Sequence, residues 1–132
     1  MGVFDKMFKS QRDVAKKEIE EFPWHPLTGM EQLDELVEKS DEQPALIFKH
    51  STRCGVSRMV LRSFENEMDF SEGDDHQFYY LDLIANRDIS NEIAKRFDVQ
   101  HESPQVIILK DGKAVHHASH HSIQAEVVKD YL

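Results

Sequence analysis

The only cysteine of the 132-residue chain, Cys54, lies in the stretch KHSTRCGVSR, residues 49–58. Disulfide chemistry usually needs a second sulfur close by, and the position three residues further on holds Ser57. A hydroxyl does not attack disulfides, whereas a thiolate does. Any disulfide exchange by this chain must therefore use one sulfur of its own and a second thiol from outside.

The surroundings of Cys54 favour a reactive thiol over a buried, inert one. The residue follows a predicted strand and opens a predicted helix, where backbone N–H groups carry partial positive charge and stabilise a thiolate. Arg53 and Arg58 add positive potential in an otherwise acidic protein. The neighbours Thr52 and Ser57 are small and polar, which does not suit a buried apolar site. Cys54 is the candidate catalytic nucleophile, with Thr52, Arg53, Ser57 and Arg58 as supporting residues.

Apolar periodicity and turn residues predict the elements that position this thiol. Strands are expected at residues 45–50, 77–84, 105–110 and 113–118, with a short first strand around 24–27. Helices are expected at about 28–40, 55–68, 90–97 and 123–132. Three of them have a candidate capping residue at the start: Thr28, paired with Glu31 in a capping box, Ser90 and Ser122. Asp111-Gly112 predicts a tight hairpin.

Strands separated by helices favour parallel pairing, and the final hairpin adds antiparallel strands. The predicted fold class is therefore α/β, with a mixed central β-sheet flanked by helices on both faces. Residues 1–21 are highly charged with a short apolar stripe, and we expect an N-terminal helical extension there. Residues 22–132 form the predicted domain.

Charge and composition exclude several classes of function. The net charge of −9 and a pI near 5.3 argue against nucleic acid and anionic membranes as partners. One cysteine cannot form an internal disulfide, so the chain is not a secreted disulfide scaffold. The N-terminal residues lack the apolar core of a signal peptide, and no segment approaches transmembrane length. A cytoplasmic location is expected.

The order of these features resembles the thioredoxin fold over residues 22–132. More closely, FKHSTRC with Ser57 three residues later, FPWHPLT upstream and SPQVIIL downstream resemble the monothiol bacilliredoxins (YtxJ-type proteins). In that family a serine replaces the second cysteine of the thioredoxin motif. The resemblance implies bacillithiol, a low-molecular-weight thiol containing malate, as co-substrate, with no other cofactor. The implied partners are bacillithiol and bacillithiolated client proteins.

The resemblance also implies an activity. Cys54 would attack the mixed disulfide between bacillithiol and a client cysteine and keep the bacillithiol, which free bacillithiol would then remove. Ser57 would donate a hydrogen bond to the Cys54 sulfur. Ser103, Pro104 and Gln105 would contact the substrate, with a cis Ser103-Pro104 bond beside Cys54.

The run HHASHH, residues 116–121, has three interpretations. Four imidazoles could bind a metal, but nothing supplies a fixed geometry, and solvated histidines at a strand end are the simpler explanation. No metal is predicted. In a thioredoxin-like sheet this strand ends near the active-site cysteine, so Ser119, His120 and His121 could bind the carboxylates of bacillithiol.

Two other functions compete with the enzyme. The chain could be a thioredoxin-like binding module with an inert Cys54, or a monothiol glutaredoxin-like protein that uses glutathione. Rapid alkylation of Cys54 near neutral pH would favour an enzyme over a binding module.

Overall fold

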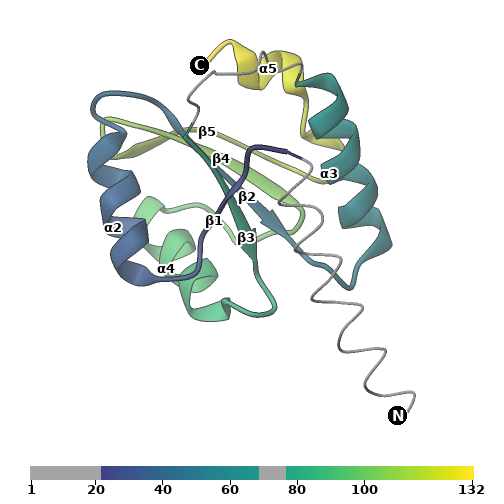
Figure 1. Ribbon diagram of the computed structural model, residues 1–132, viewed down its shortest axis with the longest axis horizontal. Helices are drawn as coiled ribbons and strands as arrows, with labels where there is room; N and C mark the ends of the chain where they lie inside the picture. The colour runs from purple at the N-terminus through teal and green to yellow at the C-terminus, as the bar shows by residue number, and fades with distance from the viewer. Residues whose placement is uncertain (1–21, 69–76) are drawn as a thin grey trace.

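The computed structural model describes residues 22–68 and 77–132, so the predicted extension at residues 1–21 lies outside the described residues (Figure 1). A five-stranded sheet has the order β1-β3-β2-β4-β5. The strands are β1 (His25–Pro26), β2 (Ala45–His50), β3 (Gln77–Asp82), β4 (Gln105–Lys110) and β5 (Lys113–Ser119). β3 pairs in parallel with β1 and β2, whereas β4 is antiparallel to β2 and β5.

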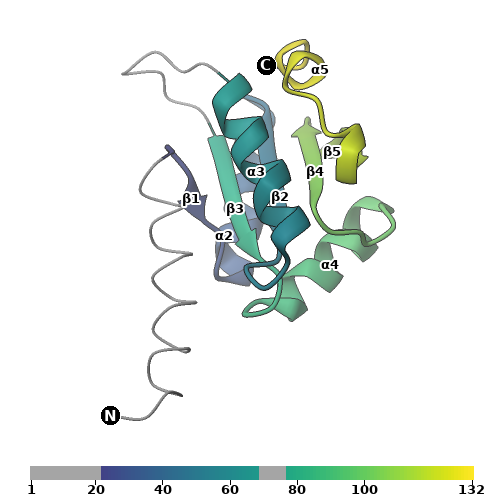
Figure 2. The ribbon, with the colours of Figure 1, turned by 90° about the vertical axis from the view of Figure 1, so that its right-hand side faces the viewer.

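Helices cover both faces of this sheet, which confirms the predicted fold class. Helices α2 (Met30–Lys39) and α4 (Arg87–Phe97) pack on one face, and α3 (Gly55–Glu67) and α5 (Ala125–Lys129) on the other. Figure 1 shows these two pairs on opposite sides of the sheet, and Figure 2 looks onto the face that α3 covers. A short 3-10 helix, η1 (His120–Ser122), joins β5 to α5.

The central strand β2 has all six residues buried, which follows from its apolar run and its position between β3 and β4. Leu46 and Phe48 face α3, while Ala45 and Ile47 face α2 and α4. Trp24, just before β1, is 5% exposed and lies among aromatic rings on the α3 face. Its ring centroid is within 6.3 Å of those of Phe22, Phe48, Phe64, Phe78 and Tyr80.

The predicted capping box at the start of α2 is wrong. The N-cap is Gly29, in an extended conformation, and no side chain caps it. Gln32 takes the role expected of Glu31, because its Oε1 accepts from the Thr28 N–H at 3.0 Å and its Nε2 donates to Pro26 O at 2.7 Å. These two bonds anchor the helix to the end of β1, and the N-cap lies one residue later than predicted.

The other two predicted caps are also wrong. Helix α4 begins at Arg87 after the N-cap Asn86, which places Ser90 inside the helix and fully buried. Ser90 Oγ lies 3.1 Å from His101 Nδ1, a tertiary contact that no local pattern shows. Ser122 ends η1, and α5 starts after the N-cap Gln124.

The predicted hairpin between β4 and β5 is confirmed. Asp111 and Gly112 both have positive φ, 53° and 73°, as the type I′ turn of a two-residue hairpin requires. Gly112 N–H donates to Ser40 Oγ at 2.9 Å, which ties this turn to the end of α2. A one-residue register shift between Ile108 and Leu109 follows the turn, and with it Ser119 lies opposite Gln105 at the other end of the two strands.

Candidate functional site

Cys54 is the N-cap residue of α3, as the sequence predicted, and its side chain is exposed. Its N–H donates to Ser51 O at 3.1 Å, and its own carbonyl accepts from the Arg58 N–H at 3.1 Å. No side chain caps the first N–H groups of α3. A negative charge on the Cys54 sulfur therefore lies at the positive end of a helix whose N–H groups no side chain has neutralised.

The turn that carries Cys54 is held by Arg58. The Arg58 guanidinium donates from Nη2 to Thr52 O at 2.7 Å and is half-buried. Thr52 itself is buried, whereas Arg53 is exposed to solvent. Thr52 and Arg58 therefore shape the turn, and Arg53 contributes charge at its surface.

Ser57 is fully buried beneath this turn and has partners other than the thiol. Its Oγ lies 2.7 Å from His50 Nδ1 and accepts from the Ser51 N–H at 3.1 Å. Within residues 22–68 and 77–132, the predicted hydrogen bond from Ser57 to the Cys54 sulfur is not formed. The hydroxyl instead connects the first turn of α3 to the end of β2.

His50, which the sequence favours as a structural or rim residue and not as a site residue, lies directly beneath this turn. It is fully buried at the end of β2, with its ring 5.6 Å from that of Tyr80 in an edge-on arrangement. The sequence does contain a signal for this residue: His50 ends an apolar run predicted to be a buried strand, so its ring would need a polar partner inside the protein. Ser57 supplies that partner.

The Ser103-Pro104 peptide bond is cis, as predicted. Pro104 is buried and immediately precedes β4, and its carbonyl accepts from the His120 N–H at 3.0 Å. Ser103 is half-buried, and its Oγ has no hydrogen-bond partner among the described residues. Gln105 is 1% exposed, and its Nε2 donates to Gln100 O at 2.9 Å. The Gln105 side chain thus supports the segment before the proline from inside the protein.

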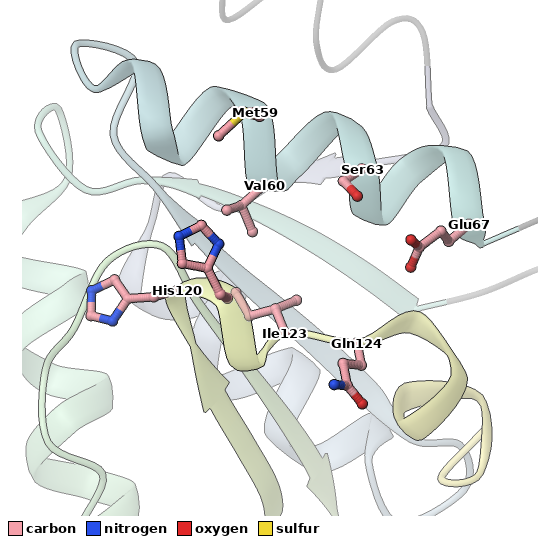
Figure 3. Close-up of a pocket in the computed structure, with 8 residues that line it drawn as sticks. Met59, Val60, Ser63, Glu67, His120, Ile123 and Gln124 are labelled. Carbon is pink, nitrogen blue, oxygen red and sulfur yellow. The ribbon is translucent and has the colours of Figure 1, made fainter.

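The residues predicted at the end of β5 lie between this proline and α3. Ser119 is half-buried, and His120 and His121 are exposed. His120 has a φ of 54°, a value that few residues other than glycine adopt, and its N–H donates to Pro104 O in this conformation. Both histidines line a hollow of about 370 Å³ against Met59 and Val60 of α3, shown in Figure 3.

The four imidazoles of residues 116–121 do not form one cluster. His116 stacks on Tyr131 with ring centroids 4.9 Å apart, and burial, followed by the charge of His117, lowers the pKa of His116. In the part of the chain that the structure describes, no three His, Cys, Asp or Glu side chains are arranged to hold a metal ion. His116 thus contacts Tyr131 near the C-terminus, whereas His120 and His121 line the hollow beside α3.

Lys49 is a second buried polar residue that the sequence analysis passed over. Its Nζ donates to Ser90 O at 3.1 Å and lies 3.4 Å from His101 Nδ1, on the face that carries α4. Burial lowers the pKa of Lys49 from 10.5 to about 8. Burial, with the charges of Lys49 and Arg87, lowers the pKa of His101 below its usual value. This cluster joins β2, α4 and the segment that leads to Pro104.

The family model of the monothiol bacilliredoxin BrxC matches residues 25–128, which include every strand and the turn that carries Cys54. The chain belongs to the monothiol bacilliredoxin family. The resemblance stated from the sequence is therefore confirmed. A thiol-disulfide oxidoreductase is the function class that this membership and the exposed Cys54 support.

Solved structures give the same fold. One of them, an oxidoreductase with a thioredoxin fold, is 27% identical in sequence to this chain and superposes with a TM-score of 0.68. The match covers 80% of this chain and 90% of that protein. Thioredoxin from Malassezia sympodialis is 18% identical with a TM-score of 0.61, covering 81% and 85%. Thioredoxin from Schistosoma mansoni is 18% identical with a TM-score of 0.59, covering 81% and 90%.

No helix of this bacilliredoxin within residues 22–68 and 77–132 is both long and apolar enough to cross a membrane.

Proposed function

We propose that this bacilliredoxin removes bacillithiol from protein cysteines, with Cys54 as the nucleophile. The observation that carries the proposal is one exposed thiol at the uncapped start of α3, with Ser57 buried and bonded to His50. A thiolate in this position can attack a disulfide, and residue 57 cannot close an internal one.

The reaction uses two successive thiol exchanges. The Cys54 thiolate attacks the bacillithiol sulfur of the mixed disulfide, that S–S bond breaks, and the client cysteine leaves as a thiolate that takes a proton from water. Cys54 then holds bacillithiol in a new mixed disulfide. A second bacillithiol thiolate attacks the bound bacillithiol sulfur, which releases the Cys54 thiolate and bacillithiol disulfide. One disulfide bond is consumed and one is formed: the client sulfur is reduced to a thiol, and the free bacillithiol that attacks last is oxidised as it joins the bacillithiol released from the client.

The hollow beside α3 suits the bacillithiol moiety in this proposal. His120 and His121 present imidazole N–H groups, which can donate to the malate carboxylates, and Gln124 adds an amide. The donors are these side chains rather than a helix N-terminus, because η1 is a single 3-10 turn. The backbone of Ser103, beside the buried Pro104, would face the client. A reducing compartment such as the cytoplasm would keep Cys54 as a free thiol.

Mass spectrometry of Cys54 tests the proposal directly. The protein is incubated with oxidised bacillithiol, oxidised glutathione or buffer, and a bacillithiolated model protein is then offered to the reduced enzyme. We expect a bacillithiol adduct on Cys54, transfer from the model protein, and loss of both in Cys54→Ala. A faster and more complete adduct with glutathione would favour the glutaredoxin-like alternative. Resistance to both disulfides, with slow alkylation, would favour the binding module.

A further inference from the structure

The outer face of α3 carries two hollows that share one line of residues. On one side, Arg58 and Arg62 line a hollow of about 470 Å³. On the other, His120 and His121 line the hollow of about 370 Å³ described above. Met59 and Ser63 belong to both, and Figure 3 shows these two side chains following one another along the helix. We call this surface the α3 ridge, defined by Arg58, Met59, Arg62, Ser63 and His120.

Two large apolar side chains are exposed on α3 after Cys54: Met59 of the α3 ridge and Val56, one turn before it. Met59 is 58% exposed and Val56 is 46% exposed, and both follow Cys54 within two helical turns. Large apolar side chains with this exposure beside a reactive thiol are typical of a surface that another chain covers. One extended segment of a client can cover the Cys54 thiol together with Val56 and Met59.

The charge on this surface is opposite to that of the protein as a whole. The charged side chains that line the two hollows are Arg58, Arg62 and Glu67, and Arg53 is exposed beside Cys54. Three arginines therefore accompany one carboxylate on this side, whereas the whole chain has a net charge of −9. Arg53 and Arg62 are exposed, and neither has an ion-pair partner in the described ranges 22–68 and 77–132. A positive face in an acidic protein attracts negative partners and repels positive ones.

We propose that the α3 ridge docks client segments whose target cysteine is flanked by acidic residues. The inference rests on the proposed function, because it names the class of client that Cys54 serves. The client's carboxylates would lie near Arg53 and Arg62 while its disulfide meets the Cys54 sulfur. Nucleic acid does not suit this surface, since the remainder of the chain would repel phosphates.

The expected effect is on the rate of encounter. Exposed ion pairs contribute little to affinity, but complementary charge raises association rates by about tenfold or more at low salt. Above an ionic strength of about 0.15 M the Debye length falls below about 8 Å, so most of this effect should be screened.

Two synthetic peptides provide the test. Both carry the same cysteine as a mixed disulfide with bacillithiol, one flanked by aspartates and the other by lysines. The rate constant for transfer of bacillithiol to Cys54 is measured for each peptide and for an uncharged small disulfide. In wild type we expect the acidic peptide to react about tenfold faster than the basic one at low salt. Arg62→Glu should abolish or reverse this ratio and leave the small disulfide unaffected.

The matched control is Lys95→Glu, which makes the same charge change at an exposed position on α4, across the sheet. It should keep the wild-type ratio. Equal rates for both peptides in wild type would overturn the docking proposal while the proposed function stands. Reaction with the small disulfide but with neither peptide would overturn both. A change of oligomeric state in Arg62→Glu, measured by sedimentation, would assign the ridge to a second copy of the chain and overturn the proposal.

Discussion

Ser57 Oγ and His50 Nδ1 lie 2.7 Å apart in the buried interface between α3 and β2. The same oxygen accepts from the Ser51 N–H, so one hydroxyl joins the end of the strand, the turn and the first turn of the helix. Cys54 lies within the segment that these bonds close. Ser57, at the position of the second cysteine of the thioredoxin motif, therefore has a structural role.

Replacing Ser57 with alanine should destabilise the protein. The change leaves His50 Nδ1 and the Ser51 N–H without this partner in a site where Ser57 is fully buried. We expect the free energy of unfolding to fall by about 1–3 kcal/mol, measured by urea denaturation. Ser63→Ala, at an exposed position of the same helix, should change it by less than about 0.5 kcal/mol. Equal effects of the two substitutions would contradict the role given to Ser57.

Replacing Ser57 with cysteine should convert the one-thiol route into a two-thiol route. Residues three apart at a helix start share a face, so the new thiol can attack the Cys54–bacillithiol disulfide. Tethered groups have effective concentrations on the order of millimolar, which competes well with free bacillithiol. Intact-mass measurement after oxidation should show an internal disulfide, lighter by two hydrogens, where wild type shows the adduct. A variant that keeps the adduct as stably as wild type would show that the two side chains do not meet.

The single tryptophan should contribute to stability through its ring and not through its N–H. Trp24 Nε1 is buried and has no hydrogen-bond partner in the described part of the chain. Trp24→Ala should lower the free energy of unfolding by about 3–5 kcal/mol, because it empties the centre of an aromatic cluster. Trp24→Phe keeps a ring and removes an unpaired donor, so it should cost less than half as much. Similar losses in both variants, by thermal or urea denaturation, would contradict this.

Lys49 should make the free energy of unfolding depend on pH in the alkaline range. In the unfolded chain the ammonium keeps its proton up to about 10.5, whereas in the folded protein burial lowers the pKa to about 8. Between these values the unfolded state binds more protons, so the free energy of unfolding should rise with pH. The rise attributable to this group is about 3 kcal/mol at most.

The measurement compares wild type with Lys49→Met by urea denaturation at several pH values from about 7.5 to 10.5. Wild type should gain stability relative to Lys49→Met across this window. Lys95→Met, which removes an exposed lysine, should follow wild type. A constant difference between wild type and Lys49→Met at every pH would show that the buried ammonium does not titrate there.

The strands and the reactive turn were predictable because their signals are local. Short apolar runs bounded by turn residues mark β2 and β4, and Asp111-Gly112 marks the hairpin between β4 and β5. Cys54 at a strand-to-helix junction follows from the same local pattern. The family's cis proline needed the resemblance, since a proline alone favours the trans form.

The features that were missed depend on which polar side chains meet, a choice that is local at the start of α2 and tertiary elsewhere. The start of α2 is decided by whether Gln32 or Glu31 reaches back to Thr28, and both are adequate capping residues. The buried pairs of Lys49 with His101 and of Ser57 with His50 form only when the sheet and helices are assembled. Apolar periodicity describes which face of an element is covered, and it carries no information about which polar atoms meet there.

The position of β2 between β3 and β4 also has a consequence for synthesis on the ribosome. The first neighbour of β2 along the chain is β3, but its other neighbour, β4, is made only after α4 has been completed. Contacts between such distant segments form slowly, because a long loop must close before they are made. The nascent chain therefore exposes an unpaired edge of β2, with Cys54 just beyond it, until most of the protein has been translated. A chaperone that covers this edge would protect the thiol from premature oxidation as well as the strand from aggregation.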